Sequence, residues 1–231
     1  MPKAYRVKAI WKTLQGEGLW AGRPAVFVRL VGCNLWSGYE KDRARDAART
    51  DAACPLWCDT DFTREGSTRY AAEELAASMA EVGGPIRFCV LTGGEPLLQA
   101  DAALVRALHA AGFFVAVETN GTVALAEAFG ESPADWPDWV VCSPKLPEDR
   151  LRLEAMDELK LVVPAYRPEA YARFAERVRP HSVGGRPLRN LWLQPEDGPR
   201  LDEATRLAVA TALTHPDWRV SVQSHKILGI D

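Results

Sequence analysis

The sequence has no run of about eighteen apolar residues, the length at which a helix becomes able to cross a bilayer. Residues 1–13 contain no apolar stretch ahead of a small-residue cleavage site, so they do not resemble a secretory signal. Basic residues are not in excess, since 28 Lys and Arg stand against 31 Asp and Glu. A net charge of -3 provides no field that attracts a phosphate backbone. We therefore expect a cytoplasmic location, no membrane span and no nucleic-acid partner.

Histidine and cysteine are both scarce. The four histidines begin only at His109, and the five cysteines are at positions 33, 54, 58, 89 and 142. An odd number with three clustered is a poor disulfide framework and fits a metal or redox site in a reducing compartment.

What the sequence does contain is typical of one globular domain covering residues 1–231. Its hydrophobic fraction is 47% and its charged fraction 26%. Short apolar runs alternate with longer amphipathic stretches, which predicts βαβ units, an α/β fold and a mainly parallel sheet. The expected strands are 5–11, 25–31, 88–91, 113–118, 139–142, 158–163, 191–194 and 220–223, and the expected helices are 70–82, 102–111, 168–178 and 202–213.

Turn-forming and polar residues follow five of these strands. Ligands collect at the carboxyl ends of parallel strands, so five such turns on one rim indicate a site. They are Cys33, the segment 93–96 (GGEP), the segment 119–121 (TNG), the segment 143–145 (SPK) and the segment 194–197 (QPED).

Residues 36–53 differ from the rest, because 39–51 consist mostly of alanine and of charges that nearly balance. We interpret this segment as a solvated helical or irregular excursion with no direct function.

Cys33, Cys54 and Cys58 have the spacing Cys-x20-Cys-x3-Cys. Three thiolates suit an iron–sulfur cluster or zinc. A structural zinc needs a fourth ligand, which only Asp59 or Asp61 offers nearby, whereas three cysteines alone describe a cluster with one open iron. Buried thiols without function are the alternative, and we favour it for Cys89 and Cys142, which lie inside apolar strands.

Several motifs together resemble one family, 7-carboxy-7-deazaguanine synthase, whose members are radical S-adenosylmethionine (SAM) enzymes. TGGEP alone is typical of the wider superfamily, whereas LQGEG, WCDT and QSHK are more specific. The motifs are TLQGEG at 13–18, RPAVFVRLVGCN at 23–34, WCDTDF at 57–62, TGGEP at 92–96, ETNGT at 118–122, SPK at 143–145, ELKLVV at 158–163, LQPEDGP at 193–199 and QSHK at 223–226.

Two departures from the superfamily concern the cysteines. The usual signature is Cys-x3-Cys-x2-Cys, and a subgroup of the family carries an insertion between the first two cysteines, which residues 36–53 resemble in longer form. Asp59-Thr60 follows Cys58 as it follows the last cysteine ligand in the family, so the resemblance implies that Cys58 is that ligand. Cys54 is then the remaining third ligand, displaced by one residue, which the loop would absorb as a bulge.

The resemblance implies an incomplete, trimmed (β/α) barrel of the radical SAM type, with a [4Fe–4S] cluster, SAM and Mg²⁺ as cofactors. Cys33, Cys54 and Cys58 would ligate the cluster, and Thr60 would contact Mg²⁺. The implied SAM contacts are Gly93, Gly94, Glu95, Ser143, Pro144, Lys145, Gln194, Pro195, Glu196 and Asp197. The implied substrate contacts are Leu14, Gln15, Gly16, Glu17, Arg29, Thr92, His225 and Asp231, the last through the terminal carboxylate.

The implied reaction converts 6-carboxy-5,6,7,8-tetrahydropterin to 7-carboxy-7-deazaguanine and ammonia, in queuosine or 7-deazapurine biosynthesis. An adenosyl radical takes a hydrogen from C6, the ring contracts, and the hydrogen returns to the cofactor. No protein side chain carries the radical. The expected partners are an electron donor such as flavodoxin or ferredoxin and a second copy of the chain in a homodimer.

Two other hypotheses stay open. A different radical SAM enzyme, such as an activase that places a radical on a partner protein, would share the cysteines and Gly-Gly-Glu-Pro but would not need LQGEG, Arg29 or QSHK. A zinc-stabilised interaction protein would carry a colourless metal without redox activity.

Overall fold

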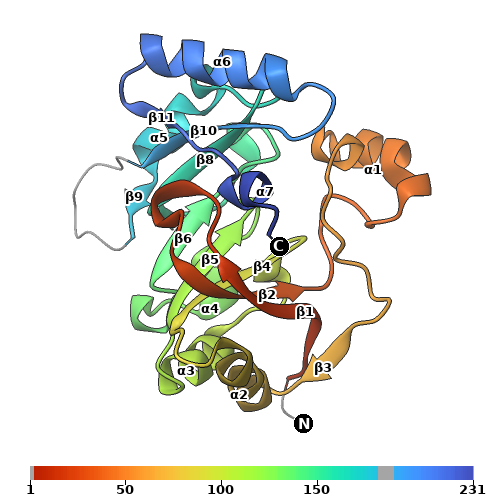
Figure 1. The fold of residues 1–231 in the computed structure, drawn as a ribbon, viewed down its shortest axis with the longest axis vertical. Helices are drawn as coiled ribbons and strands as arrows, with labels where there is room; N and C mark the ends of the chain where they lie inside the picture. Colours follow the sequence, from red (N-terminus) through yellow and green to blue (C-terminus); the bar gives the residue numbers. More distant parts are fainter. Residues whose placement is uncertain (1–2, 182–189, 231) are drawn as a thin grey trace.

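The computed structural model describes residues 3–181 and 190–230. Within them the main element is a mostly parallel sheet of nine strands in the order β11-β10-β8-β6-β5-β4-β2-β1-β3 (Figure 1). The strands are β1 Tyr5–Leu14, β2 Pro24–Leu30, β3 Thr68–Tyr70, β4 Phe88–Gly93, β5 Phe114–Thr119, β6 Trp139–Cys142, β8 Glu158–Val163, β10 Leu191–Pro195 and β11 Trp218–Val220, and a separate pair is formed by β7 Ala155–Met156 and β9 Arg179–Pro180.

The pairs from β2 through β4, β5, β6, β8 and β10 to β11 are all parallel, whereas β1 is antiparallel to both β2 and β3. The edge strands β3 and β11 do not pair with each other in the described part of the chain. The sheet is therefore an open barrel, as the sequence predicts.

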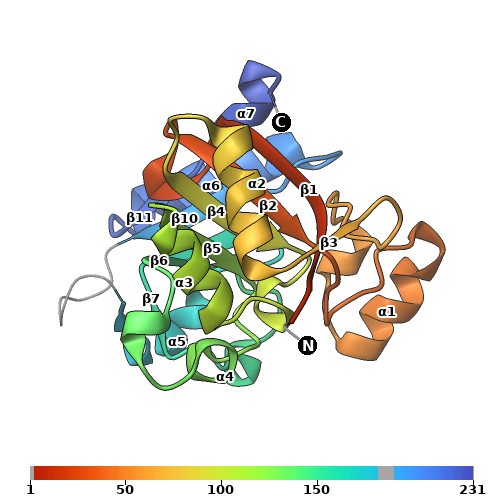
Figure 2. The ribbon, with the colours of Figure 1, turned by 90° about the horizontal axis from the view of Figure 1, so that it is seen from below.

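Helices α2 Ala72–Gly83, α3 Ala102–Ala110 and α6 Leu201–Thr214 pack against strands of the sheet on its outer face (Figure 2). The other helices are α1 Arg43–Thr50, α4 Leu125–Phe129, α5 Ala172–Arg177 and α7 Ser224–Leu228. The Asp101 carboxylate caps α3 by accepting from the amide of Leu104 at 3.1 Å. Only the five-residue α4 lies between β5 and β6, and residues 143–157 contain no α-helix, so the barrel is trimmed where short connections predict it.

Alternate residues of the central strands pack on opposite sides of the sheet. One set joins the side chains of α2 and α3 in the main core, among them Val28, Leu91, Val117, Leu75 and Leu104. The other set faces the barrel interior, where Trp20 contacts the rings of Phe88 and Trp139 at centroid distances of 5.6 and 5.3 Å. These rings fill the amino-terminal part of the interior, which leaves the carboxyl-terminal part for a site.

Two sequence expectations differ from the structure. The last strand is Trp218–Val220 rather than 220–223, because Trp218, Arg219 and Val220 pair with Leu191–Leu193 of β10. The chain then turns inward and forms α7. The segment 36–53 does contain a helix, α1, but its Asp46 and Thr50 side chains are buried, so it is not simply solvated.

Candidate active site

Two adjoining cavities lie at the carboxyl ends of the parallel strands. The first has a volume of about 210 Å³ and the second about 600 Å³. Residues that line both are Glu17, Asp59, Thr60, Thr92, Glu118, Gln223 and Lys226. The two cavities therefore form one site with two compartments, and their shared wall includes Thr60.

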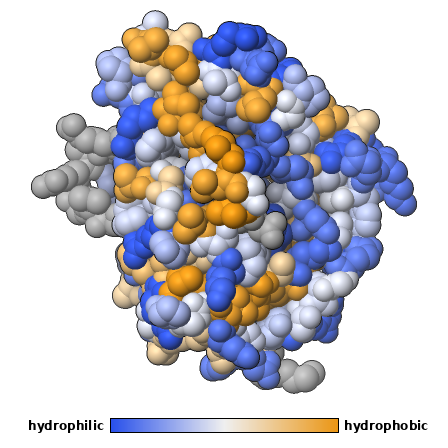
Figure 3. Space-filling model, viewed as in Figure 1, coloured by the Kyte–Doolittle hydropathy of each residue, from blue (hydrophilic) through white to orange (hydrophobic). Residues whose placement is uncertain are grey.

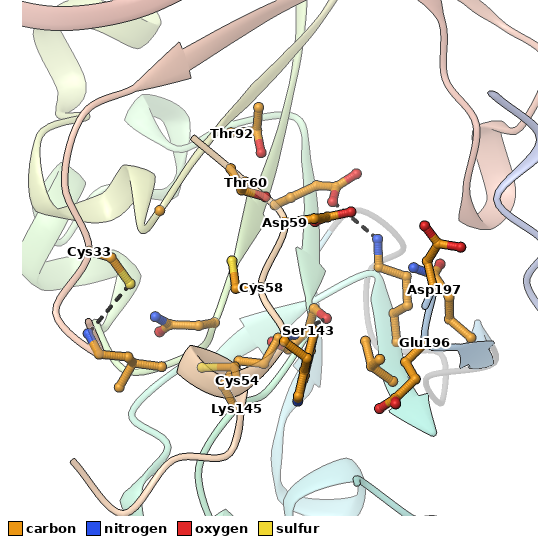
Figure 4. A pocket seen from close by; sticks show the side chains of 18 of the residues that line it. Cys33, Cys54, Cys58, Asp59, Thr60, Thr92, Ser143, Lys145, Glu196 and Asp197 are labelled. Carbon is orange, nitrogen blue, oxygen red and sulfur yellow. Dashed lines mark hydrogen bonds and ion pairs between the residues drawn. The ribbon is translucent and has the colours of Figure 1, made fainter. Parts of the chain in front are cut away.

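The three clustered cysteines all line the first cavity, and their sulfur atoms face the same space (Figure 4). Cys33 follows β2, and Cys54 begins a short 3₁₀ helix, Cys54–Leu56. The amide of Cys58 donates to the carbonyl of Cys54 at 2.8 Å, so a helical turn, rather than a bulge, accommodates the three-residue spacing. All five cysteines are free of disulfide bonds.

The chemistry of these donors suits an iron–sulfur cluster. Burial raises the pKa of Cys33 to about 11 and that of Cys54 to about 12, so their thiolates require a compensating cation. The fourth and fifth cysteines, Cys89 and Cys142, are fully buried in β4 and β6 and do not line the cavity.

The carboxylates that could complete a zinc site are engaged elsewhere. Asp59 pairs with Lys226 at 2.9 Å, and Asp61 pairs with Lys8 at 2.7 Å. Within residues 3–181 and 190–230, no three His, Cys, Asp or Glu side chains are arranged to hold a single metal ion.

Gly93 and Gly94 line the first cavity beside the cysteines. A Cβ atom on Gly94 would lie 2.4 Å from the carbonyl oxygen of Gly32 and 2.6 Å from the Cβ of Cys33. The glycine is thus required for the close approach of the Cys33 loop, in addition to any approach by a ligand.

Glu95 and Pro144 are buried and do not line either cavity. Burial raises the pKa of Glu95 to about 7, although its carboxylate accepts hydrogen bonds from Thr119 Oγ1 at 2.8 Å and the Asn120 amide at 2.7 Å. In this structure Glu95 holds the loop of Thr119 and Asn120 by these hydrogen bonds and faces neither cavity.

The other residues that the resemblance assigns to SAM surround the first cavity. Lys145 donates to Ser143 Oγ at 2.6 Å, and burial lowers the pKa of this lysine. Gln194 donates to Glu17 Oε1 at 3.0 Å, which joins the two compartments. The remaining lining residues of this group are Pro195, Glu196 and Asp197.

The second cavity brings together seven of the residues that the resemblance assigns to the substrate. They are Leu14, Gln15, Gly16, Glu17, Arg29, Thr92 and His225. Asp231 lies outside the described residues. Residues far apart along the chain, from 14 to 225, thus face one space.

Arg29 lines this cavity together with two other cationic side chains, Lys8 and Lys226. Its guanidinium lies over the Trp11 ring at 5.1 Å and makes no hydrogen bond or ion pair within the described part of the chain. Burial lowers its pKa, and the nearby carboxylates of Asp59 and Glu118 oppose that shift. Among the described residues, Arg29 is thus not held in an internal salt bridge.

Helix α7 is held against the loop after β1. The Ser224 amide donates to the Gly16 carbonyl at 2.9 Å, and Gln223 Nε2 donates to Glu17 Oε1 at 2.8 Å. A Cβ atom on Gly16 would lie 2.0 Å from His225 Nδ1, so this glycine makes room for the histidine.

A buried lysine that sequence reasoning missed connects the compartments. Lys160 of β8, with a side chain 4% exposed, pairs with Glu17 and with Glu118, the latter at 3.1 Å. Burial opposes the charge on both partners, but their attraction prevails, lowering the pKa of Glu17 to about 2 and raising that of Lys160. The sequence did contain a signal for this site residue, namely a lysine within the mostly apolar segment ELKLVV at 158–163.

Comparison with known proteins agrees with this geometry. The model of the Radical SAM superfamily matches residues 54–218, beginning at Cys54 and so leaving Cys33 and the preceding segment outside the match. The fold and the cysteine-lined cavity therefore belong to a radical SAM protein.

More specific relatives cover almost the whole chain. The 7-carboxy-7-deazaguanine synthases of Caulobacter vibrioides and Bradyrhizobium diazoefficiens are 46% and 47% identical to it, over 98% of this chain and 99% of theirs. The crystal structure of QueE from Escherichia coli matches with a TM-score of 0.67 and 27% identity, covering 95% of this chain and 93% of that one. The chain belongs to the 7-carboxy-7-deazaguanine synthase family.

Proposed function

We propose that this chain converts 6-carboxy-5,6,7,8-tetrahydropterin to 7-carboxy-7-deazaguanine and ammonia. The observation that carries the proposal is the second cavity, where six residues from distant parts of the sequence surround Arg29, which has no anionic partner in the described residues. It adjoins the cysteine-lined cavity, as a reaction between a bound radical source and a substrate requires.

The first cavity suits the cofactors. Cys33, Cys54 and Cys58 would hold a [4Fe–4S] cluster, and the rim of Gly93, Gly94, Ser143 and Lys145 with Gln194–Asp197 would hold SAM. When bound, these groups supply the radical chemistry, and the protein orients them and excludes water.

Arg29 would bind the substrate carboxylate, because a half-buried guanidinium that has no anionic partner among residues 3–181 and 190–230 favours a planar anion. Gln15 and Glu17, held by Glu118 and Lys160, would offer the amide and carboxylate that a pterin ring needs. Thr60, in the wall shared by both cavities, is placed where Mg²⁺ could bridge its hydroxyl to substrate oxygens.

The test is an Arg29→Met variant assayed with the pterin and with an analogue that lacks the carboxylate. Loss of a buried charge partner costs about 2–5 kcal/mol, so kcat/KM for the natural substrate should fall at least about 30-fold. The analogue should be turned over equally poorly by wild type and variant. Arg87→Met is the matched control, since Arg87 also lies over an aromatic ring, Phe113 at 5.5 Å, but lines neither cavity.

An unchanged kcat/KM in Arg29→Met would contradict this assignment of the carboxylate. If the wild type binds a cluster and cleaves SAM but does not convert the pterin, the substrate is a different one.

The electron donor and the assembly are also part of the proposal. A flavodoxin or ferredoxin would reduce the cluster in the cytoplasm, where the free thiols remain reduced. A homodimer would cover the exposed apolar side chains on α7 and just before it (Figure 3). They include Val222, Ile227 and Leu228, at 52%, 74% and 60% exposure. No helix in the described residues is long and apolar enough to span a membrane.

A further inference from the structure

Residues 36–53, the inserted segment, lie directly against the loop that carries Cys54 and Cys58. Its helix α1 stands at the side of the molecule and presents a hydrophilic outer surface (Figures 1 and 3). The short 3₁₀ helix at Cys54–Leu56 follows it after three residues.

The inner side of the segment is anchored to the rest of the protein. The Asp46 carboxylate, only 2% exposed, accepts a hydrogen bond from the Ser37 amide at 2.7 Å. Thr50 Oγ1 donates to the Leu35 carbonyl at 3.1 Å, and Arg150 Nη1 donates to the Thr50 carbonyl at 2.9 Å. The first contact lies within the segment, and the other two hold the carboxyl end of α1 to residues outside it, so residues on α1 can in turn fix a neighbouring loop.

Arg43 makes that connection. Its Nη2 donates to the carbonyl of Cys58 at 2.9 Å and its Nη1 donates to the carbonyl of Pro55. The guanidinium also lies over the Trp36 ring at 4.7 Å, and its Nε donates to the exposed Glu40 carboxylate at 2.7 Å. A planar guanidinium with two parallel donors constrains both position and orientation, which an ammonium does not.

We propose that Arg43 is a positioning residue for the iron–sulfur cluster, which holds the loop between Cys54 and Cys58 and places a permanent positive charge beside the site. This inference rests on the proposed cluster at Cys33, Cys54 and Cys58. Reduction makes a cluster more negative, so a fixed cation nearby stabilises the reduced form and raises the reduction potential. The inserted segment would thus stabilise the loop that contains Cys54 and Cys58, whose cysteines are spaced more widely in this chain.

The experiment compares Arg43→Gln and Arg43→Lys with Arg49→Gln in the reconstituted holoenzyme. Arg49 lies on the same helix, is 61% exposed and contacts Asp46 at 3.8 Å, so its removal deletes the same charge away from the cysteine loop. The readouts are the rate of iron release to a chelator and the midpoint potential of the cluster, measured by redox titration with electron paramagnetic resonance.

Arg43→Gln should release iron about 10- to 100-fold faster than wild type, as loss of groups supporting metal ligands typically does, and should have a more negative potential. Arg43→Lys should have a midpoint potential close to that of wild type, because it keeps the charge, but it should still release iron faster than wild type. Arg49→Gln should match wild type in both.

Equal behaviour of Arg43→Gln and Arg49→Gln would overturn the inference. If Arg43→Gln does not fold, as judged by circular dichroism, Arg43→Lys decides: wild-type iron release in that variant overturns the positioning role. A wild-type protein that assembles no cluster overturns the proposed function, whereas a stable cluster indifferent to Arg43 overturns only this inference.

Discussion

At the scale of single residues, the centre of the site is a charge network around Lys160. The lysine is almost fully buried, and it holds Glu17 and Glu118 where both line the two cavities. Gln15 and Gln194 donate to these carboxylates, so one residue from each compartment depends on the lysine. Its role is to fix the two carboxylates at the junction.

We predict that Lys160→Met destabilises the protein by about 3–5 kcal/mol, because it leaves two partly buried carboxylates without their cation. Chemical denaturation of wild type and variant at pH 7 measures this difference. A Lys160→Met, Glu118→Gln double variant should recover part of it, since it removes one of the unpaired charges.

The same network predicts the pH dependence of that difference. Because Glu17 has a folded-state pKa lowered from 4.5 to about 2, its stabilising contribution is present above pH 4.5 and is lost as the pH falls toward 2. The difference in the free energy of unfolding between wild type and Lys160→Met should become smaller as the pH falls over this range. A gap that is constant from pH 5 to pH 3 would show that the lysine acts through packing alone.

Residues of the site differ in how far the sequence predicted them. The motifs identified Arg29, Cys33 and His225, which the structure places in the cavity walls. Lys160 and Glu118 were missed as site residues, because inward-facing polar positions on a barrel strand can be told from outward ones only when the strand register is known.

At the scale of elements, α7 completes the substrate compartment. It is five residues long and largely exposed, and its attachment depends on the loop after β1 through Ser224 and Gln223. Such a short helix has no amphipathic period to detect, so the sequence predicted the QSHK residues but not the helix that carries them.

Gly16→Ala tests this attachment. Because the new methyl group would overlap His225 Nδ1, the variant should displace the histidine and reduce kcat/KM. A thermodynamic cycle with His225→Ala separates the cause: in that background Gly16→Ala should add little further loss. Equal losses from Gly16→Ala in both backgrounds would mean that the glycine acts through the backbone.

The strands illustrate why some elements were predictable. Strands β6 and β8 were predicted at their observed bounds, because strands buried on both faces are nearly continuous apolar runs. The edge strand β3, with two of its three residues exposed, was not predicted. Its pairing with β1 depends on a register that composition does not encode.

At the scale of the whole molecule, the parallel sheet explains how the site forms. On the inner face of the sheet, aromatic rings lie at the amino ends of the strands and polar side chains at their carboxyl ends. The sequence predicted this rim, since five turns follow five strands. The division into two joined cavities could not be predicted, because it depends on β1, α7 and the inserted segment, which lie outside the repeating βα pattern.

The central claim is that Cys33, Cys54 and Cys58 hold a cluster for pterin ring contraction. The most direct test reconstitutes the protein anaerobically with iron and sulfide and supplies dithionite, Mg²⁺, SAM and 6-carboxytetrahydropterin. Mass spectrometry then seeks 7-carboxy-7-deazaguanine.

We predict that the wild type forms the product, that Cys33→Ala, Cys54→Ala and Cys58→Ala each abolish it, and that Cys89→Ala, which changes a buried thiol outside both cavities, retains it. Product formation that survives Cys54→Ala would contradict the ligand set. Binding of zinc in place of a reducible cluster, with no product, would contradict the account as a whole.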